Sequence, residues 1–261
     1  AKSTANSKTL LVFDSVWSLI ELYQLERNYS KSNLKSLYTA KQHELDPEKE
    51  SNVPEQYAVW NLRPYIVFRS TLTHLKQQFF FYTDIVAFRA QKFADWPDYN
   101  FTLLTLMNLE DRVLFGQVTP SVSADSSDSH INGAFFAGSS KAVAFYFDAY
   151  YQIHDVLLEN ERFVGKGQKL MNIIEFKLGE KTCKLWLATL SSCLRDYNEW
   201  YAYQSYFSWH LKFHKLGRDL SSLSGDERKK TFLGSESIMC NNGHDPLALP
   251  SWMFCDKKFL F

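Results

Sequence analysis

Short apolar runs alternate along this chain with longer segments of helical periodicity, and this alternation constrains the fold more than any other feature. Four runs have the length and apolar character of buried strands, namely residues 9–13, 79–83, 112–118 and 184–189. Apolar residues recur at helical spacing in residues 16–27, 55–75, 140–158 and 165–178. The alternation is typical of an α/β protein. We therefore expect a mostly parallel central sheet with helices on both faces.

The charge balance excludes two classes of function. Lys and Arg together number 29, as do Asp and Glu, so the formal net charge is zero. A nucleic-acid-binding protein usually has a basic excess, and electrostatic attachment to a membrane needs one as well. The aromatic content is high, with 21 Phe, 14 Tyr and 7 Trp. Such residues fill cores, and they also line sugar and nucleotide sites.

Composition divides the chain into three parts. Residues 1–8 are polar and predict a flexible N-terminal segment, and residues 9–210 predict a single domain. Residues 211–261 are rich in turn-forming Gly and Pro, which predicts an irregular C-terminal extension packed on the same domain. No apolar run reaches the roughly 18 residues that span a bilayer. The chain starts with Ala, so an N-terminal anchor could have been removed.

Two observations bear on the compartment. The sequons at Asn28 and Asn100 favour the secretory-pathway lumen, Golgi or ER. The four cysteines, all in the C-terminal third of the chain, permit two disulfides or four buried thiols.

The aromatic run Phe79–Tyr82 stops abruptly at Asp84. In open α/β sheets the ligand site lies at the carboxyl ends of the strands, so Asp84 is a candidate ligand of Mn²⁺ or Mg²⁺. Arg89 could add a positive charge for phosphate. The alternative is that Asp84 caps a turn and Arg89 pairs with a surface acid. If the first reading holds, Asp84 should open into the largest concave pocket.

Two further segments could contact a ligand. Gly133, Phe135 and Gly138 lie in a stretch of small residues around a Phe pair, where a ligand can approach the backbone and a helix start can face an anion. Gln168 and Asn172 are four residues apart on one helix face and can hold sugar hydroxyls. A tight turn and an ordinary polar helix face are the alternatives.

In this order the segments resemble the HtrL/YibB family of glycosyltransferases. The matching stretches are Val12–Ser15, Glu26–Asn28, Tyr57–Leu62, Phe81–Asp84, Ala87–Arg89, Trp96–Asp98, Asp111–Gln117, Gly133–Gly138 and Gly165–Asn172. The resemblance covers roughly residues 9–210. It implies a GT-A-like fold and transfer of a sugar from a nucleotide-sugar donor to an acceptor. The abrupt end of the aromatic strand at Asp84 also predicts that Arg89 and the phosphate-facing helix start after Gly138 lie within reach of its carboxylate.

The chain departs from the family pattern at several positions. Val86 and Phe88 replace Gly and Trp, and Ala134 replaces a second Gly. Gly167 stands where the family carries an acid, which is a plausible base for the acceptor. The resemblance thus predicts a diverged, weakly active glycosyltransferase in which Gly167→Asp raises turnover. The alternative is an inactive carbohydrate- or nucleotide-binding module. No catalytic residue is assigned.

Overall fold

The computed structural model describes residues 14–29, 33–84, 88, 96–97, 102, 106–107, 109, 111–119, 130–186, 199–201, 203–204, 207 and, for the backbone alone, 238–240. The strand predicted at 9–13 and nearly all of the C-terminal extension lie outside these residues. The described part is an α/β structure, which confirms the fold class predicted from the alternation.

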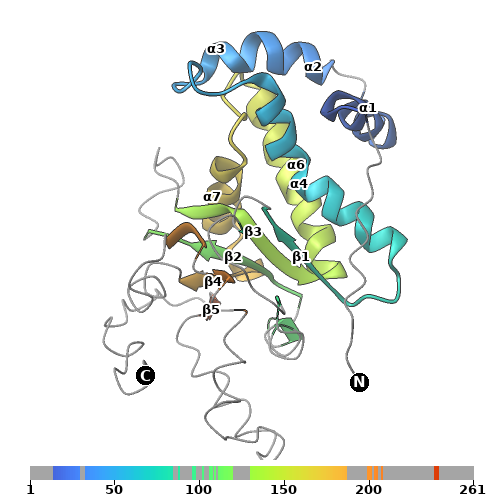
Figure 1. Ribbon diagram of the computed structural model, residues 1–261, viewed down its shortest axis with the longest axis vertical. Coiled ribbons are helices and arrows are strands. Elements are labelled where there is room, and N and C mark those ends of the chain that lie inside the picture. Colours follow the sequence, from blue (N-terminus) through green and yellow to red (C-terminus); the bar gives the residue numbers. More distant parts are fainter. Residues whose placement is uncertain are drawn as a thin grey trace, which may run out of the picture.

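The described strands form a five-stranded sheet in the order β1-β3-β2-β4-β5, which lies below the long helices in Figure 1. Its strands are β1 (Phe79–Thr83), β2 (Val113–Gln117), β3 (Ile131–Ser139), β4 (Thr182–Trp186) and β5 (Ile238–Cys240). Strands β1 and β2 lie within the predicted runs 79–83 and 112–118, and β4 overlaps the predicted run 184–189. The short β5 shows that part of the predicted irregular extension joins the sheet.

The expectation of a mostly parallel sheet is wrong for the described strands. Only β2 and β4 are parallel, whereas β3 runs antiparallel to both β1 and β2, and β5 antiparallel to β4. The reason is the position of β3, a strand that is not among the four predicted runs. It inserts between β1 and β2 and reverses the chain direction there.

The long helices cover one face of this sheet. Figure 1 shows α4 (Pro54–Thr73), α6 (Ser140–Glu159) and α7 (Gly167–Lys177) rising from the sheet. Ser139 caps α6 by accepting a hydrogen bond from Ala142 N at 3.1 Å. Buried residues of these helices pack on Val113, Phe115, Ile131 and Phe136 of the sheet in the larger core cluster.

A smaller core lies on the opposite face. Leu114, Phe135, Ala137 and Leu185 point to this side, where they meet Tyr203 and Phe207. The described pieces on this face are short, such as η4 (Glu199–Tyr201). The sheet therefore has a core on each face, but the long helices of the described residues all lie on one face and not on both as predicted.

Short helices build the end of the molecule away from the sheet, shown at the top of Figure 1. Next to α1 (Val16–Glu26), which Ser15 caps, come α2 (Leu34–Leu37), a π-helical turn η1 (Tyr38–Gln42) and α3 (His43–Leu45). Residues 28–54 are polar, with Asn, Ser, Lys and Pro, a composition that favours a loop with one short helix. Because Leu34 and Tyr38 are buried, packing against α6 stabilises more helix here than local propensity indicates.

Candidate functional site

The candidate site is built around an irregularity in β3. Next to β2, the pairing changes register between Phe115↔Phe136 and Gln117↔Ile131, so extra residues of β3 bulge out. These residues include Asn132, Gly133 and Ala134, and we call 132–134 the β3 bulge. Asn132 Oδ1 accepts a hydrogen bond from Ala134 N at 2.6 Å, which fixes the turn. Bulges re-aim backbone groups, and they recur beside active sites.

Asp84 lies against the β3 bulge, one residue beyond the end of β1. Its backbone N–H donates to Ala134 O at 2.9 Å. Its carboxylate Oδ2 accepts from Arg63 Nη2 at 2.9 Å, and Arg63 Nη1 donates to Gly133 O at 2.6 Å. The Arg63 side chain is 13% exposed and that of Asp84 is 24% exposed. One guanidinium from α4 therefore connects the end of β1 to the bulge.

A tyrosine ring supports this guanidinium. The Arg63 guanidinium carbon is 5.3 Å from the centroid of the Tyr82 ring. Burial raises the pKa of Tyr82 to about 12, an effect that Arg63 opposes and Asp84 reinforces. Tyr82 is therefore neutral at physiological pH, so its ring face attracts the Arg63 guanidinium while Asp84 remains the negatively charged partner of Arg63.

The start of α7 completes the site. A Cβ placed on Gly133 would be 2.7 Å from Gln168 Cγ, so the absence of a side chain at 133 lets Gln168 lie over the bulge. Gly167 adjoins Tyr150 in the same way, since its Cβ would be 2.8 Å from the Tyr150 hydroxyl and 3.4 Å from Trp60 O. Trp60 O faces this space because Pro64, four residues on, has no N–H to donate to it.

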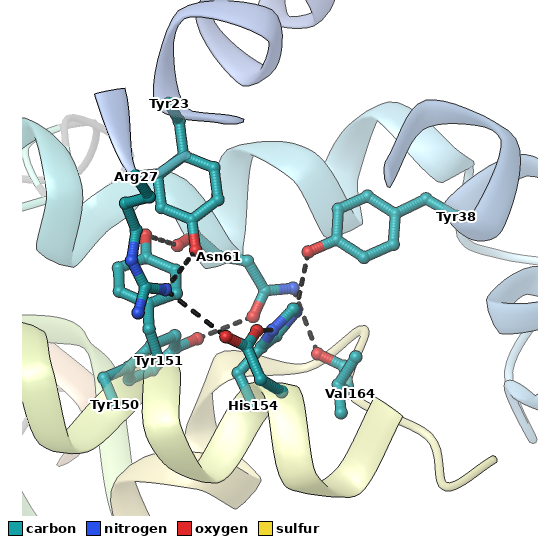
Figure 2. Close-up of polar contacts among 9 residues, drawn as sticks. Tyr23, Arg27, Tyr38, Asn61, Tyr150, Tyr151, His154 and Val164 are labelled. Carbon is teal, nitrogen blue, oxygen red and sulfur yellow. Dashed lines mark hydrogen bonds and ion pairs between the residues drawn. The ribbon is translucent and has the colours of Figure 1, made fainter. Parts of the chain in front are cut away.

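Buried hydrogen bonds around Asn61 hold α4, α6 and the segment before α7 in place (Figure 2). The Asn61 side chain accepts from Tyr150 OH at 2.7 Å and donates to Val164 O at 3.0 Å. Its backbone carbonyl accepts from Tyr151 OH at 2.6 Å. Farther from the sheet, the Tyr38 hydroxyl and His154 Nε2 form a hydrogen bond at 2.9 Å (Figure 2). The network positions Gly167 and Gln168 relative to Arg63.

The structure brings together three of the predicted donor-binding residues. Asp84, Gly133 and Gln168 all adjoin the β3 bulge, although they come from separate segments of the chain. Arg89 lies outside the described residues.

The other three predicted residues lie elsewhere. Phe135 is buried in the smaller core, where its ring stacks on Tyr203 with centroids 4.8 Å apart. Gly138 pairs with Phe80 near the opposite end of β3, so the helix start that follows it is remote from Asp84. Asn172 is buried, and its Oδ1 accepts from Ile131 N at 2.9 Å. Its described role is to attach α7 to β3.

Asp84 was expected to open into the largest pocket, but it lines neither of two cavities formed by described residues. A groove of about 170 Å³ lies at the far end of the helices, lined by Tyr29, Leu37, Lys41, Gln42, Leu45, Leu158, Glu159 and Glu161. The cavity beside the bulge, lined by Arg63, Gly133 and Gly167 among others, has about 10 Å³, close to the space for one buried water. Asp84 lines neither, because Arg63 fills the space between its carboxylate and the cavity.

The described residues show no second protein ligand for the Mn²⁺ or Mg²⁺ predicted at Asp84. Mg²⁺ is usually held by one or two carboxylates together with substrate phosphates and waters. The described part of the chain contains no group of three or more His, Cys, Asp or Glu side chains able to hold a metal. The Asp84 carboxylate is instead in an ion pair with Arg63.

Sequence reasoning missed Arg63 altogether. A signal was present, since Arg63 interrupts the nearly apolar stretch Trp60–Phe68 of α4, and a charge on a buried helix face needs a partner. The identity of that partner depends on the tertiary structure.

None of the described helices has the length and apolar character of a membrane span. Comparisons with known protein families, with curated proteins and with solved structures find no match to this chain.

Proposed function

We propose that the chain is a glycosyltransferase-type domain that binds a nucleotide-sugar at the β3 bulge and transfers the sugar slowly. The observation that carries this proposal is the meeting of Asp84 and Gly133 on one guanidinium, with Gln168 packed against Gly133. A nucleotide-sugar offers one or two phosphate groups for the cation and hydroxyls for carboxylate and amide groups. The donor would lie along the outer side of the bulge, since the cavity behind it has room only for water.

The described chemistry favours binding over turnover. Transfer to a hydroxyl acceptor is accelerated by a positioned base, which contributes roughly 10²–10⁴-fold. Gly167 offers no such group. Burial raises the pKa of Tyr150 well above its ordinary range, so this neighbouring hydroxyl remains protonated at neutral pH and cannot act as a phenolate base. A GT-A-like relationship, as the sequence resemblance implies, is part of the proposal.

The packing of Gly167 favours a second candidate function, a binding module without transferase activity. The Tyr150 hydroxyl occupies the space that the first side-chain atom at 167 would need. The two candidates differ in one respect, which is whether product accumulates over time when donor and acceptor are present.

A donor screen tests both. The melting temperature would be measured with UDP-, GDP- and CMP-sugars, each with and without Mn²⁺, because a ligand that binds the native state raises it. We expect at least one donor to raise the melting temperature. Slow release of free sugar from that donor would support the transferase, whereas binding without release would support the binding module. If no donor changes the melting temperature, both candidates are wrong.

A further inference from the structure

Arg63 is a largely buried cation with unused hydrogen-bonding capacity. A guanidinium carries five N–H donors. The described contacts of Arg63 are one hydrogen bond from Nη1 to Gly133 O and one from Nη2 to Asp84 Oδ2. Its Nε is buried and has no hydrogen-bond partner in the described structure. Most buried polar atoms are paired, so an unpaired nitrogen at this position calls for an explanation.

The position of Arg63 matches that of a ligand-binding group. It lies between the β3 bulge and the ring of Tyr82, which holds the guanidinium plane from one side. Its anionic partner Asp84 is 24% exposed and lies beyond the last paired residue of β1. A guanidinium matches the geometry of phosphate oxygens, to which it can donate two parallel hydrogen bonds.

We infer, on the basis of the proposed function, that Arg63 rather than a metal ion supplies the positive charge for the diphosphate of the donor. Asp84 is the counter-ion of Arg63 in the unliganded protein, and the diphosphate replaces it. A buried charge without a partner is strongly unfavourable, which explains why a carboxylate stands here when no ligand is bound. When the diphosphate arrives, the same carboxylate competes with it for the guanidinium.

Because of this competition, removing the charge of Asp84 should change donor affinity in the direction opposite to that expected for a metal site. If Asp84 held a divalent ion, its neutralisation would weaken donor binding. If Asp84 is the counter-ion that the ligand displaces, its neutralisation strengthens donor binding and at the same time destabilises the unliganded protein. Asp84→Asn separates the two cases because the amide keeps the shape of the carboxylate and removes its charge.

The experiment measures UDP and GDP affinity by calorimetry, with a chelator present and then with Mn²⁺. Wild type would be compared with Asp84→Asn, Arg63→Gln and the control Arg69→Gln. Arg69 is a second arginine of α4, which pairs with Glu26 at 3.3 Å and lies outside the bulge. We expect binding in chelator, about tenfold weaker in Arg63→Gln and unchanged in Arg69→Gln, since a charged hydrogen bond of this kind is worth about one order of magnitude.

Asp84→Asn decides the matter even if Arg63→Gln fails to fold. We expect it to bind UDP or GDP several-fold more tightly while its unliganded melting temperature falls. Loss of binding in Asp84→Asn, or binding of wild type only when Mn²⁺ is present, would overturn the assignment of Arg63. Neither of those two outcomes contradicts the proposed function. That function is contradicted if no donor raises the melting temperature in the screen described above.

Discussion

At the scale of single residues, Gly167 is the position where the structure changes a sequence-based expectation most. The resemblance led us to expect that Gly167→Asp raises turnover. The structure shows that its Cβ would be 2.8 Å from the Tyr150 hydroxyl, which Asn61 holds at 2.7 Å. We now expect Gly167→Asp to lower the free energy of unfolding by about 1–3 kcal/mol, the usual cost of overpacking a core. Denaturant unfolding would measure it.

The double variant Tyr150→Phe/Gly167→Asp is the matched control for this prediction. Removing the hydroxyl makes room at 167, so the double variant should be more stable than the sum of the two single changes predicts. If Gly167→Asp alone is as stable as wild type, the packing argument is wrong. If only the double variant gains turnover, Tyr150 is what prevents an acid from acting at 167.

The buried ion pair between Lys184 of β4 and Glu175 of α7 makes a second residue-scale prediction. The two side chains are 6% and 5% exposed, and Lys184 Nζ is 2.7 Å from Glu175 Oε1. Lys184→Met leaves Glu175 buried without its lysine, which should cost about 3–5 kcal/mol. The exposed pair of Lys141 and Asp111, at 3.4 Å, provides the control. Lys141→Met should leave the unfolding midpoint unchanged, and equal losses in both variants would contradict the role of burial.

At the scale of elements, the sequence predicted which segments form helices and strands better than how the strands are arranged. The helices α1, α4, α6 and α7 follow from apolar spacing and from cap residues such as Ser139, both of which are local signals. Strand direction is not local. The insertion of β3 between β1 and β2 depends on which faces become buried, and the same apolar pattern is compatible with either direction.

For the candidate site too, features with a local sequence signal were predicted and features that depend on the tertiary structure were not. Asp84, Gly133 and Gln168 were found because acids after strands, glycines in strands and amides on helices carry sequence signals. Phe135 and Gly138 were misplaced because the bulge and the length of β3 set which face and which end they occupy. Arg63 was missed because its partners are a carboxylate and a carbonyl that lie far from it along the chain.

The sheet edge at β4 and β5 makes an element-scale prediction. Cys183 is disulfide-bonded. In the antiparallel pairing of β4 with β5, the residue opposite Cys183 is Cys240. We expect peptide mapping without reduction to recover these two cysteines in one cross-linked species, which disappears on reduction. Recovery of Cys183 linked to Cys193 or Cys255 instead would contradict the pairing and, with it, the place of β5 in the sheet.

At the scale of the whole molecule, the buried tyrosines predict how stability depends on pH. Burial raises the pKa of Tyr23, Tyr38, Tyr57, Tyr65, Tyr82, Tyr146, Tyr150, Tyr151 and Tyr203 above the ordinary value of 10.0. A raised folded-state pKa contributes stability that is fully present below the unfolded value and is lost as pH rises through the folded value. The tyrosines therefore stabilise the fold at neutral pH, and their contribution falls above pH about 10.

Alkaline titration checks this prediction. Tyrosinate absorbance and far-ultraviolet circular dichroism would be followed together as the pH rises. We expect most of the tyrosinate signal to appear in one step that coincides with loss of helix, because the buried hydroxyls ionise only as the chain unfolds. Gradual ionisation near pH about 10 with intact circular dichroism would show that these rings are accessible, contrary to the structure.

The central claim is that the β3 bulge and the residues around it bind a nucleotide-sugar. Hydrogen–deuterium exchange tests it most directly, comparing the free protein with the protein saturated by the donor that raises the melting temperature most. The account predicts slower exchange in peptides that cover the end of β1, residues 131–139 of β3 and the first turn of α7. Protection confined to the far groove, at residues 37–45 and 158–161, or to no peptide of the bulge, would contradict it.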